Sequence, residues 1–191
     1  MSHKLSSQED ITNFPAPIKA IFKMSHKLWE DDQILETSQD LETFEQTVLE
    51  LTTQLQAVLV EHKIQKSLDS EQVIDDSRKL AKNLPCKVTN KGFRDVVITT
   101  KSGICILVHT LYCIGKKKGR ARKKKRNKGF YPGLLLFGIY DHCTPGLISE
   151  IGATVAAACS FEEAKDTLLR NGIELDVKTI RDLAYWMAQR A

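Results

Sequence analysis

The residues best suited to binding chemistry form one dense cluster of cations. Between residues 116 and 128 the chain has ten basic residues and no acid: Lys116, Lys117, Lys118, Arg120, Arg122, Lys123, Lys124, Lys125, Arg126 and Lys128. Each phosphate that such cations neutralise releases counterions, so the cluster predicts affinity for a polyanion, and its arginines add bidentate phosphate contacts. The rest of the chain has 18 basic and 24 acidic residues, so the basic character is local. We therefore expect a basic loop that contacts nucleic acid, with a solvated or localisation-type loop as the alternative.

A second group of candidate contact residues lies on the last predicted helix, which Asp176 caps. In a helix-turn-helix, the last helix enters the major groove and presents its N-terminal side chains to base edges. By position, these side chains are Lys178, Thr179, Arg181 and Tyr185. Plain packing of a small helical bundle gives the same pattern, and the connection 171–176 is longer than a tight turn. Both interpretations stay open at this point.

Metal binding and catalysis find little support in the sequence. Five cysteines form no CxxC pair, and Cys113 has no second thiolate within two to four residues, as a structural zinc site requires. Adjacent acids such as Asp31-Asp32 and Asp75-Asp76 point to different sides of a helix, so neither pair predicts a carboxylate site. We expect reduced thiols in a cytoplasmic protein, and we predict no catalytic residue, metal or cofactor.

The elements that position these residues begin with a helical region over 1–84. Pro15 and Pro17 mark the start of a first helix, and a second helix begins near Ser38. Its apolar positions alternate steps of three and four, which is typical of a heptad seam: Leu41, Phe44, Val48, Leu51, Leu55, Val58 and His62. This seam predicts either a homodimer through residues 40–66 or an intramolecular hairpin with the first helix. A polar helix from Ser70 to Asn83 follows and ends before Pro85.

In the second half of the chain the sequence pattern changes from helical to strand-forming and back to helical. Residues 95–100 and 104–112 are β-branched and aromatic and flank the turn 101–103, so they predict a β-hairpin. Three helices follow, capped at Thr144, at Ser160 and at Asp176, with Asn171-Gly172 ending the second. The predicted fold class is α+β and mostly helical. We expect three parts: a helical, possibly coiled-coil region (1–84), a hairpin with the basic loop (85–143) and a three-helix, helix-turn-helix-like unit (144–191).

Residues 81–191 resemble the pre-catalytic part of bacterial insertion-sequence transposases of the DDE type. The resemblance is carried by the segments 111–113 (LYC), 129–132 (GFYP), 143–147 (CTPGL), 160–164 (SFEEA) and 176–184 (DVKTIRDLA), in this order. In that family a zinc-ribbon-like hairpin leads into a helical DNA-binding module, and an RNase H-like domain with three metal-binding carboxylates follows. Here the Lys/Arg run replaces the family's paired cysteines, and the sequence ends after the last DNA-binding helix.

The resemblance implies the DNA-binding portion of a truncated or frameshifted transposase, which would recognise transposon ends during transposition and DNA recombination without strand transfer by this chain alone. From the residues alone, we expect a DNA-binding protein with no membrane span, because no apolar run approaches roughly 18 residues. The alternative is a protein–protein interaction module that uses the heptad helix, with the basic loop docking an acidic partner or RNA.

Overall fold

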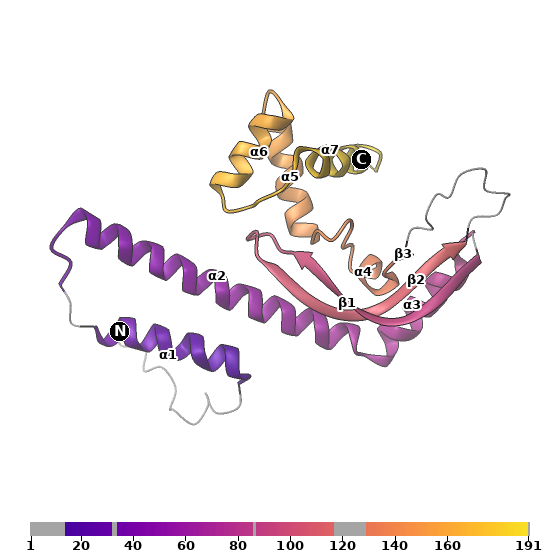
Figure 1. The fold of residues 1–191 in the computed structure, drawn as a ribbon, viewed down its shortest axis with the longest axis horizontal. Helices are drawn as coiled ribbons and strands as arrows, with labels where there is room; N and C mark the ends of the chain where they lie inside the picture. The colour runs from indigo at the N-terminus through magenta and orange to yellow at the C-terminus, as the bar shows by residue number, and fades with distance from the viewer. Residues whose placement is uncertain (1–13, 32–33, 86, 117–128, 191) are drawn as a thin grey trace. The chain divides into compact units, whose positions relative to one another are not determined.

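The computed structural model describes residues 14–31, 34–85, 87–116 and 129–190. These ranges contain seven α-helices and one three-stranded antiparallel sheet with the order β1-β2-β3 (Figure 1). The elements are α1 (Ala16–Glu30), α2 (Ser38–Leu68), α3 (Glu71–Asn83), β1 (Lys87–Thr99), β2 (Cys105–Lys116), β3 (Gly129–Phe130), α4 (Pro132–Leu136), α5 (Pro145–Ala157), α6 (Phe161–Arg170) and α7 (Val177–Ala188). The predicted α+β, mostly helical class is confirmed.

The chain divides into two compact units, residues 1–60 (unit 1) and residues 61–191 (unit 2). The boundary falls within α2, because this helix of 31 residues extends from one unit into the other. The division at residues 84 and 143 that we drew from the sequence stays a prediction. None of the described helices is both long and apolar enough to cross a bilayer.

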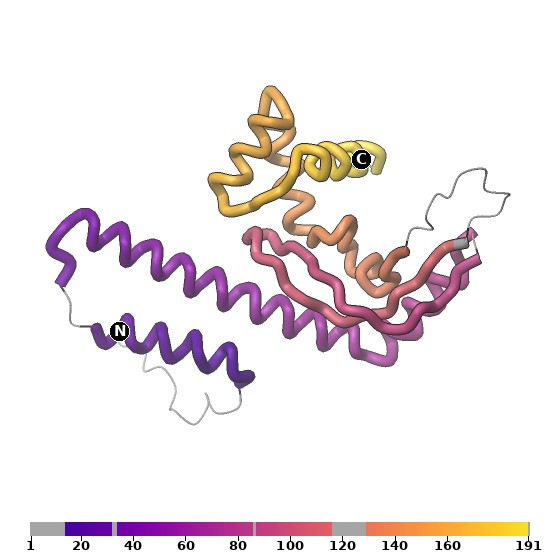
Figure 2. Tube along the Cα trace, in the orientation of Figure 1, coloured from indigo at the N-terminus to yellow at the C-terminus, as the bar shows by residue number. Residues whose placement is uncertain are grey.

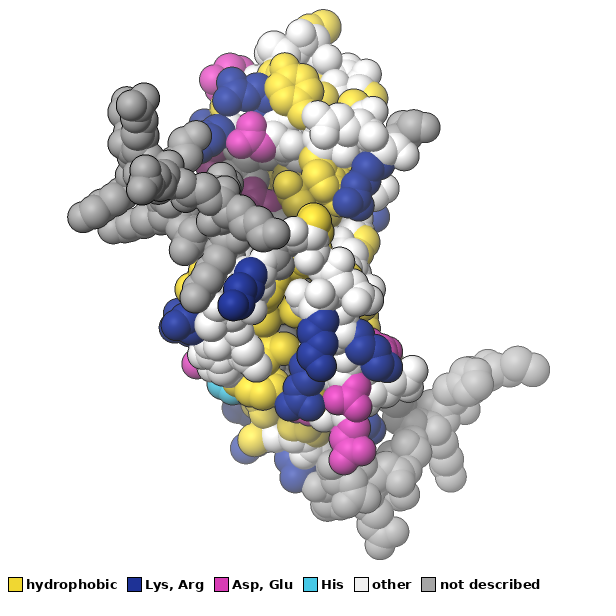
Figure 3. Space-filling model, turned by 90° about the vertical axis from the view of Figure 1, so that its right-hand side faces the viewer, with side chains coloured by type: hydrophobic (Ala, Val, Ile, Leu, Met, Phe, Trp, Pro, Cys, Tyr) yellow, Lys and Arg dark blue, Asp and Glu magenta, His cyan; other side chains and the backbone are white. Residues whose placement is uncertain are grey.

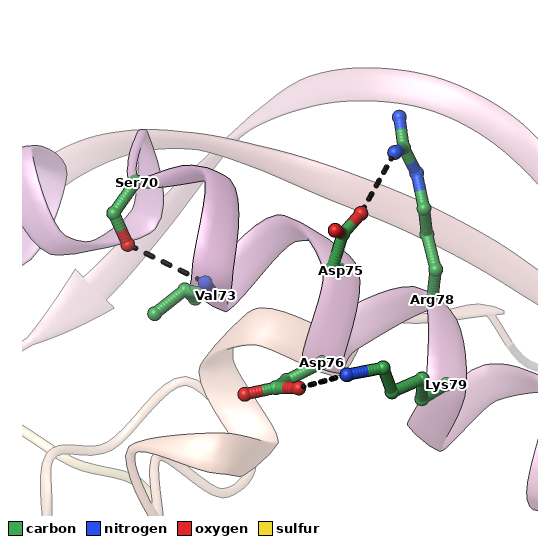
Figure 4. A network of polar contacts seen from close by, with 6 residues as sticks. All are labelled: Ser70, Val73, Asp75, Asp76, Arg78 and Lys79. Atoms are coloured by element: carbon green, nitrogen blue, oxygen red, sulfur yellow. Dashed lines mark hydrogen bonds and ion pairs between the residues drawn. The ribbon is translucent and has the colours of Figure 1, made fainter.

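The first three helices start where local capping signals predict. Pro15 precedes α1. Thr37 and Asp40 form a reciprocal capping box at the start of α2: the Thr37 hydroxyl accepts from the Asp40 N–H at 3.2 Å, and the Asp40 carboxylate accepts from the Thr37 N–H at 2.9 Å. Ser70 caps α3 by accepting from the N–H of Val73 (Figure 4). These bonds span three residues, so the sequence around each helix start is enough to form them.

The heptad seam of α2 is only partly buried. Leu51 is buried, whereas Leu41, Phe44 and Val48 leave 46%, 41% and 39% of their surface exposed. In unit 1, Ala57 of α2 and Ile18 and Ile21 of α1 are also buried. The N-terminal part of the seam therefore has apolar surface available for a further partner.

The predicted hairpin is confirmed, and its strands are longer than predicted. The turn forms at residues 100–104, where the N–H of Gly103 donates to the Thr100 carbonyl and Gly103 takes a φ of 80°. The strands pair from Thr99↔Cys105 to Lys87↔Lys116, and the register shifts between Asn90 and Phe93. Gly92 lies in this irregularity with a φ of 84°, and its N–H donates to the Asn90 side chain at 2.8 Å. Beyond this irregularity the pairing continues from Asn90 to Lys87, through sequence that carries no alternating pattern.

Other segments of unit 2 occupy the edges of this hairpin. On β2, the side-chain amide of Gln65 accepts from the His109 N–H at 2.8 Å and donates to the His109 carbonyl at 3.1 Å, as a neighbouring strand would. On β1, the Thr99 N–H donates to the His142 carbonyl, and the Thr144 N–H donates to the Thr99 carbonyl. At His109 and Thr99 the strand edges are therefore occupied by distant residues of the same unit and cannot pair with another chain at these positions.

The last three helices, α5, α6 and α7, follow one another at the C-terminal end of the chain (Figure 2) and share one apolar core. The buried members are Cys143, Leu147, Ile148, Ile151, Leu168, Ile173, Ile180 and Leu183. Burying one such Leu or Ile side chain contributes about 1.5–3 kcal/mol. At the start of α6, Ser160 accepts from the Glu163 N–H at 3.1 Å as predicted, and the Glu163 carboxylate accepts from the Cys159 N–H. Thr144 holds the N-cap position of α5 but makes no side-chain capping bond.

Candidate nucleic-acid interface

The exposed face of α7 carries three of the four side chains predicted to read base edges. Lys178 and Arg181 are exposed, and Tyr185 leaves 57% of its surface exposed. Their spacing of three and four residues places them on one side of the helix, opposite the buried Ile180 and Leu183. The edge of the Tyr185 ring meets the Phe161 ring at 6.2 Å between centroids. This face could lie along a groove while the opposite face holds the core.

The fourth predicted side chain, Thr179, has its hydroxyl engaged within the helix. It donates to the Asp176 carboxylate at 2.8 Å, and the Thr179 N–H donates to the same carboxylate at 2.8 Å. These bonds hold the pKa of Asp176 below its usual value, the backbone N–H being the larger cause. The N-terminus of α7 is therefore capped by a negative charge, and Lys178 is better placed for a phosphate than the helix end itself, whereas Nε of Arg181 lies 3.8 Å from the Asp182 carboxylate.

The predicted basic loop lies largely outside the described residues. The structure gives the backbone of Lys116 at the end of β2, and Lys117, Lys118, Arg120, Arg122, Lys123, Lys124, Lys125, Arg126 and Lys128 fall in the range 117–128, which it does not describe. The two residues that bound the range are described. β2 and β3 pair through Cys113↔Phe130 and Ile114↔Gly129, so the basic segment connects neighbouring ends of these two paired strands.

Most other cations in unit 2 are dispersed or paired. Arg78 and Lys79 of α3 lie 3.2 and 3.0 Å from the carboxylates of Asp75 and Asp76 on the same helix (Figure 4). On the face shown in Figure 3, Lys and Arg side chains are interspersed with acidic, neutral and hydrophobic ones. Residues 144–190 include five basic and seven acidic residues. The three-helix unit therefore has no excess of cations to supply affinity for a polyanion by charge alone.

A cluster of one cation and three rings, which the sequence does not reveal, lies on and beside the hairpin. The Arg94 guanidinium lies over the Tyr112 ring, 4.5 Å from its centroid. The rings of Tyr112 and Tyr131 are 5.1 Å apart, and those of Tyr131 and His142 are 6.2 Å apart. These residues come from β1, β2, the residue before α4, and the turn before α5, so no local pattern could have joined them.

Two cysteines of unit 2 are buried and are therefore poorly suited to metal binding or nucleophilic attack. Cys113 and Cys143 are buried, and burial raises the pKa of both thiols, that of Cys143 to about 11. Both thiols stay protonated near neutral pH, whereas metal binding and nucleophilic attack use the thiolate. Within the described ranges, no group of three or more His, Cys, Asp or Glu side chains is arranged to hold a metal ion.

One carboxylate–imidazole pair lies on the hairpin. Asp95 is in the middle of β1, where we expected an element boundary, and its carboxylate lies 2.6 Å from Nδ1 of His109. Both side chains are exposed. In the described part of the chain no Ser, Thr or Cys is hydrogen-bonded to the His109 ring, so the pair lacks the nucleophile that a catalytic triad requires.

Comparison with known proteins adds no identification. Neither the models of known protein families, nor the curated proteins, nor the solved structures give a match to this chain.

Proposed function

We propose that this chain is the DNA-binding portion of an insertion-sequence transposase and recognises transposon ends in the cytoplasm. The proposal covers recognition only, and no residue is assigned to strand transfer. It is supported by the resemblance of residues 81–191 and by the charge distribution. The observation that carries it is the segment 116–128, with ten cations and no acid in a chain that is otherwise acidic.

The two candidate contact regions would make different contributions to binding. Cations of the segment 116–128 would neutralise phosphates and supply affinity that does not depend on sequence. Lys178, Arg181 and Tyr185 on α7 would reach base edges and phosphates next to the groove. Because residues 144–190 carry more acids than bases, α7 depends on the basic segment to hold the duplex close enough for readout.

Binding of the whole chain to a mixed duplex over a range of salt concentrations tests this function. We expect a linear fall of log K with log salt, with a slope of roughly −5 to −9 if six to ten phosphates are contacted. Competition with single-stranded RNA of the same length should displace little protein. A flat plot, or no binding in dilute buffer, contradicts the proposal. Stronger binding to RNA than to duplex DNA would show that RNA is the ligand of the basic segment.

A second copy of the chain is the proposed protein partner, through residues 40–66. The apolar side chains Leu41, Phe44 and Val48 follow a 3.5-residue period, which is typical of a seam between helices that wind around one another. All three are exposed in a single chain. This exposed seam is also what favours the alternative function, a protein–protein interaction module.

Substitution within the seam tests the dimer. We expect Val48→Glu to weaken self-association at least roughly tenfold, because each copy would bury a carboxylate in the interface. The control is Gln56→Glu, which adds the same charge at an exposed position outside the seam. Sedimentation equilibrium gives the association constants. A monomeric wild-type chain, or equal loss in both variants, would contradict the proposal.

A further inference from the structure

The cation and ring cluster on the hairpin lies outside both predicted contact regions. It consists of Arg94, Tyr112, Tyr131 and His142, all within unit 2, and is called here the hairpin cluster. Tyr112 precedes the β2 residues that pair with β3, and Tyr131 directly follows β3. The hairpin cluster is therefore next to the strand ends from which the segment 117–128 departs.

Arg94 is the member able to bind an anion strongly. Its side chain is exposed, and among the described residues no carboxylate oxygen lies within ion-pair distance of it. Arg78 and Lys79 of α3, by contrast, are each paired with an acid. Stacking on Tyr112 restricts the Arg94 side chain, so less conformational entropy is lost when its N–H groups bind a ligand.

Tyr131 supplies a second donor at a fixed place. Its ring is half-buried between Tyr112 and His142. Burial and the neighbouring Tyr112 raise the pKa of Tyr131, so its hydroxyl keeps its proton and remains able to donate. The Tyr112 ring is pressed against Gly129, where any side chain would overlap it. This close approach fixes the ring over which Arg94 lies and against which the Tyr131 ring is tilted.

His142 positions the cluster. Its Nδ1 lies 3.0 Å from the Val97 carbonyl, and because a carbonyl only accepts, Nδ1 is the donor. Asp141 and His142 have φ values of 47° and 65°, an uncommon conformation for residues other than glycine. The bond to β1 and the contact with Tyr131 thus hold a tight turn against the hairpin.

We propose that Arg94 and the Tyr131 hydroxyl form a phosphodiester-binding site for the backbone of duplex DNA. The inference rests on the proposed function and adds a contact that neither predicted region includes. A guanidinium presents only donors and the tyrosine hydroxyl can donate beside it, so an anion with several acceptor oxygens matches them. On hairpin elements of unit 2, this site would fix the register of the duplex, whereas the segment 116–128 supplies attraction.

The test compares variants of the full chain on one duplex across a salt series. We expect Arg94→Ala to lower affinity roughly tenfold or more and to make the log–log slope shallower by about 0.9, the value for one phosphate. Arg94→Lys should keep the slope and lose part of the affinity, because the charge is retained but the planar guanidinium that donates two parallel hydrogen bonds is lost. Tyr131→Phe should lose roughly threefold with the slope unchanged. Arg78→Ala, which removes an exposed but paired arginine, is the control and should change affinity less than twofold.

The outcomes separate this site from the general function. If the wild-type chain binds with a steep slope and Arg94→Ala matches it, the hairpin site is overturned and the proposed function stands. If the wild-type chain does not bind duplex DNA, both are overturned. A purely structural role for Arg94 predicts a lowered melting temperature with an unchanged slope, and that result also overturns the site. If Arg94→Ala fails to fold, Arg94→Lys and Tyr131→Phe decide: wild-type affinity in both overturns the site.

Discussion

Replacing Lys123, Lys124, Lys125 and Arg126 together with Gln is expected to lower affinity for duplex DNA by up to roughly 10³-fold near 0.1 M salt. Each phosphate contact contributes about 0.9 to the slope of log K against log salt. Losing four contacts therefore makes the slope shallower by roughly 3–4. Fluorescence anisotropy of a labelled duplex at four or five salt concentrations measures both quantities.

The matched control removes four exposed lysines elsewhere in the chain. Lys19, Lys23, Lys27 and Lys63 are exposed on α1 and α2, so their replacement by Gln changes the net charge by the same amount. We expect this control to retain most of the wild-type slope, because affinity for a polyanion depends on the local density of cations. An equal loss in both variants would mean that net charge, rather than the segment 116–128, carries the binding.

Gly103→Ala is expected to destabilise the chain far more than Gly92→Ala. Both glycines have a φ near 80°, which costs an alanine about 1–2 kcal/mol. At Gly92 an added Cβ meets nothing within 4 Å, whereas at Gly103 it would lie 2.1 Å from the carbonyl oxygen of Gly172. That atom is backbone, so the hairpin turn or the end of α6 must move. We expect a further loss of about 1–3 kcal/mol for Gly103→Ala, in the range of an overpacked site.

Urea unfolding of the two variants beside wild type measures the difference. The loss in free energy of unfolding for Gly92→Ala gives the cost of backbone strain alone. Subtracting it from the loss for Gly103→Ala gives the cost of the clash between the hairpin turn and Gly172. Gly172→Ala is a second control, since Gly172 has a φ of 77° and open space around its Cβ position. Equal losses at residues 92 and 103 would show that this contact contributes nothing to stability.

The starts of the helices and the hairpin turn could be predicted because their causes are local. Ser70, Ser160 and Asp176 each accept from a backbone N–H three residues further on, and Gly103 closes a turn of five residues. Such bonds depend on a few neighbouring residues, which the sequence shows directly. In α5 and α7 the core residues Leu147 and Ile151, and Ile180 and Leu183, recur at helical spacing, which is also a local feature of the sequence.

The extent of the hairpin and the contact that covers its edge at His109 could not be predicted in this way. Residues 87–94 are mostly polar and lack an alternating pattern, and they join β1 because β2 supplies partners for their backbone. The amide of Gln65 replaces a missing strand beside His109, 44 residues away. Nothing near either residue indicates that the two will meet.

The amino-acid sequence by itself determined the local features of this protein: helix caps, the turn, the apolar stripes and a segment of ten cations. Tertiary structure alone decided which residues of distant segments meet. It placed Arg94 of β1 over Tyr112 of β2, with no carboxylate within ion-pair distance among the described residues, and it brought Tyr131 between Tyr112 and His142. The register shift between Asn90 and Phe93 sets which β1 residues lie beside Tyr112. The register of two strands depends on all the residues that pair along them. A shift in that register therefore cannot be read from the residues around it.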